Sequence, residues 1–378
     1  MKNLLTVPKQ DGFYMPAEFE KHAATYMIWP QRPDNWRGGA KFAQEVFIKA
    51  AQAISENELV IMLVSAAQYK NARARLSSEI MTVNVENDDA WARDTGATFI
   101  VNGLGGLRGI DWKFNAWGGA CCGLYASWDK DDLVAGRMCE FEDADRYRAD
   151  DFVLEGGSIC VDGQGTAITT EACLLSAGRN PSMTKEEIEK KLKDFLNVSK
   201  VIWLKRGIYM DETSEHVDNI ACFSSPANVA LAWTDDKNDP QYEMSKSCFD
   251  ILSAQTDAAG RKINVHKIPL PAAQFMTSAE AGGIESVKGV KTRKAGDRLA
   301  ASYINHYICN GAVICPAFND PADETAKKIL ENLYPQRKII QIYSREILLG
   351  GGNIHCITQQ VPKRRILPPE IRKTRSLI

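Results

Sequence analysis

A repeated order of secondary-structure elements is the feature that most restricts how this 378-residue chain can fold. Three stretches, which begin at Phe152, His216 and Ala301, each read as two apolar strands, a helix and a further strand. In the first, Asp-Gly-Gln-Gly joins the two strands, as is typical of a hairpin, and Pro181 and Ser182 mark the predicted helix start. Units of this kind stack or close radially, so that neighbours cover one another's apolar faces.

The N-terminal part contains two further, incomplete copies of this unit. Residues 23–30, a helix over 41–55 and residues 58–64 resemble part of one copy, and residues 96–112 resemble the opening hairpin of another. No linker rich in Pro, Ser, Gly or charge separates the copies. We therefore expect a single ring-like α/β domain over residues 1–378, with five units as the inferred count, because closure also protects sheet edges.

Composition limits the function classes. Hydrophobic residues make up 44% and charged residues 25%, which is typical of a globular protein with a sizeable core. The net charge of -2 argues against nucleic acid or anionic membrane as partners. The chain shows no signal-peptide core and no run of about 18 apolar residues. Ten cysteines without a C-x-x-C motif fit reduced thiols, so we expect a cytoplasmic protein.

Polar residues capable of chemistry gather where the units begin. They lie at or just outside the first strand of a unit, and in a ring such equivalent positions point toward one axis. The hypothesis is a single site formed by Asp94, Glu155, His216, Asp218 and Cys356.

Cys356 lies in the sequence GGGNIHCITQQ, behind three glycines. A cysteine becomes a nucleophile when it is held as a thiolate, and an imidazole such as that of His216 can favour that state and move protons. The glycines at 350–352 allow a close approach of the backbone to a ligand. The alternatives are a packed core thiol and an ordinary tight turn before a strand.

The three acids distinguish between cysteine chemistries. A cysteine protease needs hydrogen-bond donors for its oxyanion, whereas Asp94, Glu155 and Asp218 supply acceptors. A guanidinium group carries five N–H donors and a permanent charge, which carboxylates match. The acids therefore predict a guanidinium substrate, and the alternative for each acid alone is a solvated charge or helix cap.

A metal site is the other reading of these residues. His216 and Asp218, two apart on a predicted strand, would face the same side, while consecutive His355 and Cys356 would face opposite sides. At most one of the latter pair would then join the cluster. Because no zinc-binding motif is present, no metal is expected.

Long motifs of the chain resemble the agmatine deiminase family of the guanidino-group-modifying (pentein) superfamily. They include DAWARDTG, FVLEGGS, DETSEHVDN and GGGNIHCITQQ, and the match covers nearly the whole chain. The resemblance implies a five-bladed α/β-propeller of pseudo-repeated ββαβ units. It also implies hydrolysis of agmatine to N-carbamoylputrescine and ammonia, and no cofactor. We further expect a homo-oligomer.

The resemblance also assigns roles to individual residues. It implies Cys356 as the nucleophile, His216 as the acid and base, Asp94 and Asp218 as guanidinium ligands, and Glu155 as the acid that orients His216. Substrate-binding roles fall on Trp91 along the aliphatic chain, Glu212 at the distal amine, Trp117 and Gly352. Core or rim packing explains the two tryptophans equally well.

Two departures from the family pattern keep alternatives open. Ser214-Glu215 replaces Asn-Gly before the histidine, which adds a negative charge there, and Asn319 replaces a glycine. A poorly active or non-catalytic guanidine- or polyamine-binding paralogue, or a deiminase of another small guanidine, would fit such changes. An arginine deiminase would need inward cations for the substrate carboxylate, with Arg93 and Arg179 as the candidates.

Overall fold

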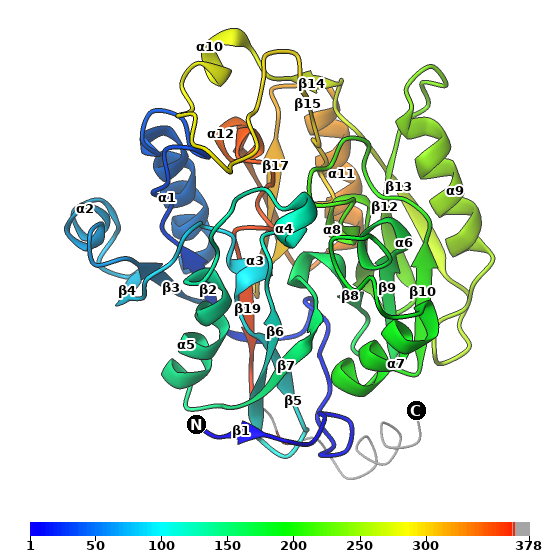
Figure 1. Ribbon diagram of the computed structural model, residues 1–378. Helices are drawn as coiled ribbons and strands as arrows, with labels where there is room; N and C mark the ends of the chain where they lie inside the picture. Colours follow the sequence, from blue (N-terminus) through cyan, green and yellow to red (C-terminus); the bar gives the residue numbers. More distant parts are fainter. Residues whose placement is uncertain (365, 367–378) are drawn as a thin grey trace.

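The computed structural model describes residues 1–364 and 366 and has a mixed α/β fold (Figure 1). The strands are β1 (Asn3–Leu4), β2 (His22–Ile28), β3 (Leu59–Val64), β4 (Met81–Asn84), β5 (Thr98–Val101), β6 (Leu107–Lys113), β7 (Asp145–Val153), β8 (Cys160–Val161), β9 (Thr166–Thr170), β10 (Lys200–Leu204), β11 (Ala221–Ser225), β12 (Asn228–Trp233), β13 (Asn264–Pro269), β14 (Gln274–Phe275), β15 (Arg298–Leu299), β16 (Tyr307–Ile308), β17 (Ala312–Ala317), β18 (Lys338–Tyr343) and β19 (Gln359–Pro362).

Helices connect and cover these strands, and within the described residues none is both long and apolar enough to cross a membrane. They are α1 (Lys41–Ser55), α2 (Tyr69–Arg75), α3 (Ala92–Thr95), α4 (Gly119–Cys122), η1 (Asp131–Leu133), α5 (Val134–Phe141), η2 (Gly156–Ser158), α6 (Glu171–Leu174), α7 (Lys185–Leu196), α8 (Val217–Ile220), α9 (Gln241–Ser253), α10 (Ser278–Ala281), α11 (Ala322–Leu333) and α12 (Arg345–Leu349). The predicted start of α7 was too early, because Thr184 caps this helix in a capping box with Glu187.

Five sheets of the described chain share one pairing pattern, in which a first strand pairs antiparallel with a second, and the second pairs parallel with a third. The triples are β5-β6-β7, β8-β9-β10, β11-β12-β13, β16-β17-β18 and β19-β2-β3. A crossover helix joins each parallel pair, as the geometry of parallel strands requires. The predicted strand-strand-helix-strand order is therefore confirmed.

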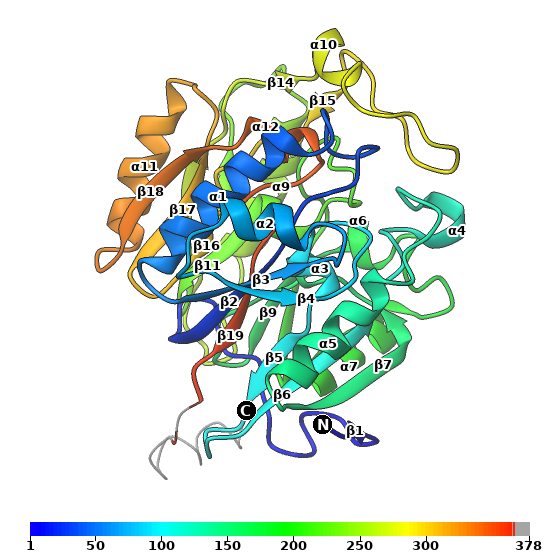
Figure 2. The same ribbon diagram turned by 90° about the vertical axis from the view of Figure 1, so that its left-hand side faces the viewer.

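The first unit is completed by the far end of the chain. β19 pairs antiparallel with β2, with Gln359 opposite Tyr26, and Figure 2 shows the two strands side by side. The unit looked incomplete in the sequence because its first strand lies more than three hundred residues after its second. This pairing joins the two ends of the described fold and positions the segment that carries Cys356.

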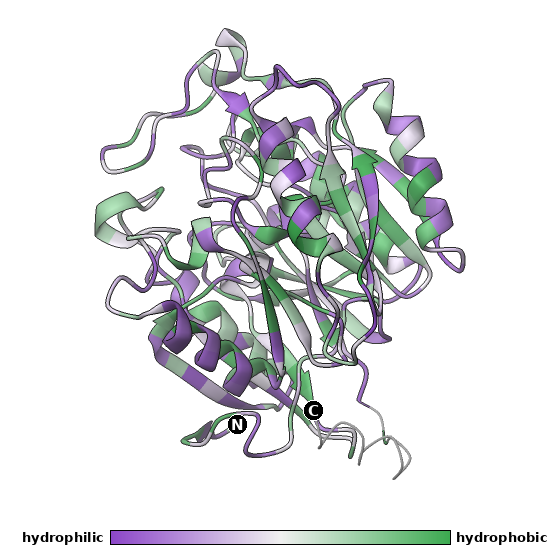
Figure 3. Cartoon of the chain, turned by 90° about the vertical axis from the view of Figure 1, so that its right-hand side faces the viewer, coloured by the Kyte–Doolittle hydropathy of each residue, from purple (hydrophilic) through white to green (hydrophobic). Residues whose placement is uncertain are grey.

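The core lies between the sheets and their crossover helices. The middle strands are covered on both faces, so β17 is buried throughout and reads as a continuous apolar run. The helices mix hydrophilic and hydrophobic residues, whereas the strands between them are largely hydrophobic (Figure 3). α7, for example, buries Ile188, Leu192, Phe195 and Leu196 on one side.

Candidate active site

Short turns before the first strands carry the candidate residues. Asp94 lies in α3 before β5, Glu155 immediately precedes η2 before β8, Asp218 lies in α8 before β11, and Cys356 lies in the turn before β19. Each first strand begins later than the sequence suggested, and a helical turn takes up the difference. These turns bring residues from distant parts of the chain to one place.

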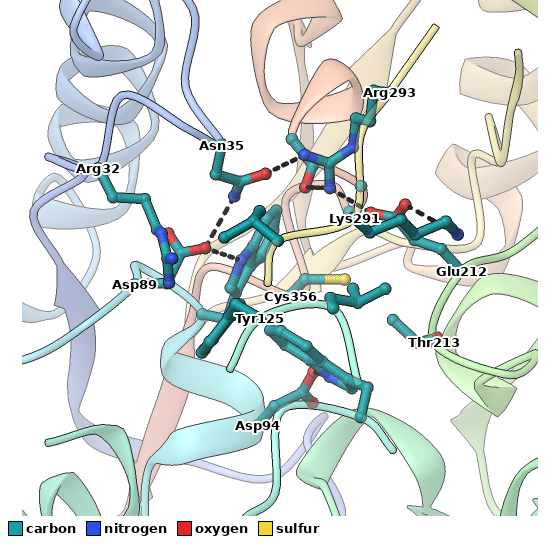
Figure 4. Close-up of a pocket in the computed structure, with 17 residues that line it drawn as sticks. Arg32, Asn35, Asp89, Asp94, Tyr125, Glu212, Thr213, Lys291, Arg293 and Cys356 are labelled. Atoms are coloured by element: carbon teal, nitrogen blue, oxygen red, sulfur yellow. Dashed lines mark hydrogen bonds and ion pairs between the residues drawn. The ribbon is translucent and has the colours of Figure 1, made fainter. Parts of the chain in front are cut away.

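A cavity of about 460 Å³ opens above the thiol. Its lining includes Cys356, Asp94, Glu212, the two tryptophans Trp91 and Trp117, and the glycines at 350–352. In Figure 4 the sulfur of Cys356 lies between Asp94 on one side and Glu212 on the other. Cys356 and Asp94 therefore face the same space.

The thiol of Cys356 is almost fully buried among acceptors and one donor. Its Sγ lies 3.6 Å from Oδ2 of Asp218, and Nδ2 of Asn305 donates to it at 3.2 Å. Burial raises the pKa of Cys356 well above its ordinary value, and the carboxylates of Asp218 and Asp94 raise it further. Both effects favour the neutral thiol over the thiolate.

His216 lies behind Asp94, with Nε2 3.5 Å from Oε2 of Glu155 and Nδ1 3.9 Å from Oδ2 of Asp94. Burial alone would lower its pKa, but the surrounding acids, Asp94 first, outweigh burial and raise the pKa well above the usual value. Arg179 places Nε 2.7 Å from Oε1 of Glu155. This guanidinium overcomes the effect of burial and lowers the pKa of Glu155, which stays ionised beside the imidazole.

Two geometric expectations from the sequence are wrong. His216 and Asp218 do not share a strand, since His216 is the residue before α8 and Asp218 is inside that helix. His355 and Cys356 do not lie on opposite faces of a strand, because the backbone there forms a turn. Both therefore reach Asp218, with His355 Nδ1 2.8 Å from its Oδ2.

His355 extends the site away from the cavity and was not predicted to take part. Its Nε2 lies 2.9 Å from Oε2 of Glu18, which also accepts from Nη2 of Arg93 at 2.9 Å. Burial alone would raise the pKa of Glu18, but His355 and Arg93 outweigh it and lower that pKa. The chain of contacts holds Asp218 in position behind the thiol.

Asn305 is a second residue that sequence reasoning missed. Besides contacting the sulfur, its Oδ1 accepts from the backbone N–H of His355 at 3.0 Å, and its Nδ2 donates to Asn219 at 3.0 Å. Asn305 lies two residues before β16, in the same relation to its unit as Asp218 to β11. The repeat pattern itself was the signal that could have found it.

Cys173 lies against His216, although it was not among the residues expected to form the site. One ligand atom each of Cys173, Glu155 and His216 lie within 4.8 Å of one another, a set that could hold a metal ion. Arg179 already contacts the carboxylate of this set, so a cation is present beside it. The group surrounds the imidazole on the side away from Asp94.

The departures from the family pattern leave the backbone of both turns intact. Ser214, Glu215 and Asn319 all adopt positive φ, at 68°, 67° and 55°, a conformation that glycine and asparagine accept most easily. The added charge of Glu215 points to Arg206, whose Nε donates to it at 2.8 Å. The expected extra negative charge is therefore paired with a cation.

The arginines singled out from the sequence do not line the cavity. Arg93 is bound to Glu18, and Arg179 to Glu155. Arg32 and Arg293 line it instead. Arg32 pairs with Asp34 at 2.7 Å, and Arg293 pairs with Glu212 and donates to the carbonyl of Gly350 at 2.7 Å.

Gly157 marks the point where the polar groups converge. A methyl group at this position would lie 2.6 Å from Nδ1 of His216 and 2.9 Å from both Oδ2 of Asp218 and Oδ1 of Asp94. We expect Gly157→Ala to lower kcat/KM about a hundredfold, because misplacing catalytic groups by about 1 Å has that cost. Steady-state kinetics and a melting curve check this.

Gly282→Ala is the matched control for that variant, since its methyl group would lie 3.2 Å from the carbonyl oxygen of Ser278 and 4.0 Å from that of Ala279, away from the polar groups of the site. It should keep full activity. Full activity in Gly157→Ala would contradict the idea that the polar groups around Gly157 must keep their positions for catalysis.

The fold and site define a class, the guanidino-group-modifying enzymes of the pentein superfamily. A family model described as Porphyromonas-type peptidyl-arginine deiminase matches residues 14–362. Putative agmatine deiminase 1 of Listeria monocytogenes is 60% identical over 363 residues, covering 96% of this chain and 100% of that protein. Agmatine deiminase of Ectopseudomonas mendocina is 51% identical over 363 residues, with 96% and 99% covered.

A solved structure gives the same result. The agmatine deiminase of Enterococcus faecalis is 49% identical and has a TM-score of 0.94, with 96% of this chain and 100% of that chain covered. The chain belongs to the agmatine deiminase family, as its motifs predicted.

Proposed function

We propose that this protein hydrolyses agmatine to N-carbamoylputrescine and ammonia through a covalent amidino-cysteine intermediate. The observation that carries the proposal is a buried thiol that shares a cavity with Asp94 and lies 3.6 Å from Oδ2 of Asp218, in a chain 60% identical to a putative agmatine deiminase. The protein is a hydrolase that acts on carbon–nitrogen bonds.

Asp94 and Asp218 form the clamp for the guanidinium group. Oδ1 of Asp218 is buried and has no hydrogen-bond partner among the described residues. An orphaned buried carboxylate oxygen is costly, and a guanidinium N–H would satisfy it. Held this way, the central carbon of the substrate faces Sγ of Cys356, which converts binding energy into proximity.

The first half-reaction breaks a carbon–nitrogen bond. The bound cation offsets the carboxylate charges that keep Cys356 protonated, so the substrate itself favours the thiolate, and the thiol proton is released to solvent as the substrate binds. The thiolate attacks the guanidinium carbon and gives a tetrahedral adduct. His216, as imidazolium, donates a proton to the departing nitrogen, ammonia leaves, and a cationic amidino thioether remains on the sulfur.

The second half-reaction adds water. Neutral His216 takes a proton from a water molecule, whose oxygen attacks the same carbon. Collapse of this adduct breaks the carbon–sulfur bond, returns the thiolate and releases the ureido product. Glu155 keeps the imidazole oriented through both steps, in line with its contact at 3.5 Å.

A rapid-quench experiment tests the proposal. Protein mixed with agmatine and quenched in acid should carry one amidino group on Cys356, and a colorimetric ureido assay should detect product from agmatine in excess over arginine. Tight binding of agmatine without ammonia or ureido product would instead identify a binding protein that lacks turnover.

Glu212 is assigned to the distal amine of the substrate. In the empty cavity it pairs with Arg293, and its Oε2 lies 3.6 Å from Nζ of Lys291. We expect Glu212→Gln to raise KM for agmatine about tenfold to a hundredfold, since a charge-assisted hydrogen bond contributes about 1.5–3 kcal/mol. Because the amine lies far from the reacting carbon, kcat should change less.

Glu243→Gln, an exposed position on α9, is the control and should leave KM unchanged. An unaltered KM in Glu212→Gln would place the amine elsewhere. The comparison needs only initial rates over a range of agmatine concentrations.

The proposal also includes the arrangement of the sheets, the cellular location and the partners of the protein. We infer that the five sheets surround the site as five propeller blades in one catalytic domain over residues 1–378, in line with their common pairing pattern. Ten free cysteines support a cytoplasmic location, because thiols stay reduced there. Homo-oligomer formation, independence of cofactors and the lack of a nucleic-acid partner remain predictions.

A further inference from the structure

Two adjacent cysteines lie at the surface next to the candidate active site. Cys121 and Cys122 close α4, and of the ten free cysteines in the described chain they alone are exposed. Their sulfur atoms are 2.8 Å apart, and Sγ of Cys121 lies 3.2 Å from the carbonyl oxygen of Gly118. α4 overlies α3 and α8 in Figure 1 and forms the edge of the molecule in Figure 2.

We propose that Cys121 and Cys122 form a reversible oxidation site that reacts with low-molecular-weight disulfides and slows the enzyme when oxidised. The thiolate of one cysteine attacks the disulfide, forms a mixed disulfide and releases one small thiol. The second cysteine, as thiolate, then attacks the protein sulfur and releases the other small thiol. The two cysteines lose two electrons and two protons, and the small disulfide is reduced to two thiols.

The local geometry makes this bond easy to reverse. Consecutive Cα atoms are about 3.8 Å apart, whereas disulfides usually join Cα atoms about 4.4–6.8 Å apart. Closing the ring therefore requires the turn of α4 to open, and a strained, exposed disulfide is readily reduced again.

Opening the turn of α4 would change the candidate active site by moving Trp117. Cys122 N–H donates to the carbonyl of Gly118 at 3.3 Å, and Leu124 N–H donates to that of Ala116 at 3.0 Å. Ala116 and Trp117 both have positive φ, at 55° and 62°. Such backbone is strained in residues other than glycine and persists only where its surroundings impose it.

Trp117 in turn contacts the guanidinium clamp. Its Nε1 donates to Oδ2 of Asp94 at 2.8 Å, and its ring packs edge-on to Trp91, with ring centroids 6.4 Å apart. When α4 opens, the left-handed backbone relaxes and this hydrogen bond is lost. Asp94 then loses one of the contacts that position it beside Cys356.

The inference rests on the proposed function, and the test separates the two. The reduced protein is first assayed with agmatine, which tests the function alone. It is then incubated with oxidised glutathione, and the peptide that contains residues 121 and 122 is examined by mass spectrometry. We expect a mass lower by two hydrogen atoms, a fall in kcat/KM on the order of tenfold to a hundredfold, and recovery with dithiothreitol.

Single substitutions test whether the fall in kcat/KM depends on Cys121 and Cys122. Cys121→Ser and Cys122→Ser should each have the basal activity of the reduced protein and should not form the internal disulfide, so their rates should be less affected. Cys248→Ser, with the thiol buried in α9, should respond like the unsubstituted protein. A stable glutathione adduct in place of the internal disulfide, or an internal disulfide with unchanged kcat/KM, would overturn the proposal.

Discussion

Cys356→Ala is expected to abolish agmatine turnover, with a fall in kcat on the order of 10⁵- to 10⁶-fold, while agmatine still binds. In the proposed mechanism the sulfur forms the covalent bond to the guanidinium carbon, and among the described residues that line the cavity Cys356 is the one cysteine. The carboxylates of Asp94 and Asp218 remain, so the cation keeps its partners. Product assays and calorimetric titration with agmatine measure the two effects separately.

The control is Cys248→Ala, which removes a buried thiol from α9, away from the cavity. It should lose stability slightly and keep its turnover. Retained turnover in Cys356→Ala would end the covalent mechanism, since no bond to sulfur could then form. Loss of both turnover and binding, with an intact melting transition, would mean that the sulfur serves the clamp instead.

His216→Ala has the second-largest expected effect, a fall in kcat of about 10³- to 10⁴-fold, because in the proposed mechanism the residue donates a proton in the first half-reaction and accepts one in the second. The neighbouring acids outweigh burial and raise the pKa of His216 well above the usual value, so the imidazolium form persists at neutral pH. Activity that depends on this form is retained as pH rises and is lost only above the raised pKa.

A pH series therefore distinguishes an acid from a structural residue. The unsubstituted protein should show an alkaline decline in kcat/KM far above the ordinary histidine pKa of about 6.5, and the residual activity of His216→Ala should lack that decline. His266→Gln, on β13, should keep the profile, since its ring contacts only Asn228 and Asn264 among the described residues. An unchanged alkaline decline in His216→Ala would assign the titration to another group.

Local patterns explain which parts of the fold were predictable. Apolar runs such as β12 and β17 alternate with amphipathic helices such as α9, because burial imposes one period on strands and another on helices. The prediction errors closest to the site lie where the repeated units begin, because His216 and His355 were expected on strands. Turns there have no periodic burial pattern, so spacing alone does not predict which way their side chains face.

The site was predictable in its residue types and less so in its contacts. The acids around Cys356 indicated a cation, which the cavity shared by Asp94 and Cys356 supports. The links through His355 to Glu18, and through Asn305 to the sulfur, were not foreseen. Each of these contacts joins residues at least fifty positions apart, and the sequence around one residue does not indicate which distant residue it will contact.

The sequence by itself determined the repeated unit and the family and predicted Cys356 as the reacting thiol, because each depends on residue types in a local order. The tertiary structure alone decided that β19 completes the first unit, that Glu215 turns to Arg206, and that α4 carries an exposed thiol pair above the clamp. These features depend on where the backbone of distant turns meets in space, and that position is set by the packing of whole sheets and helices.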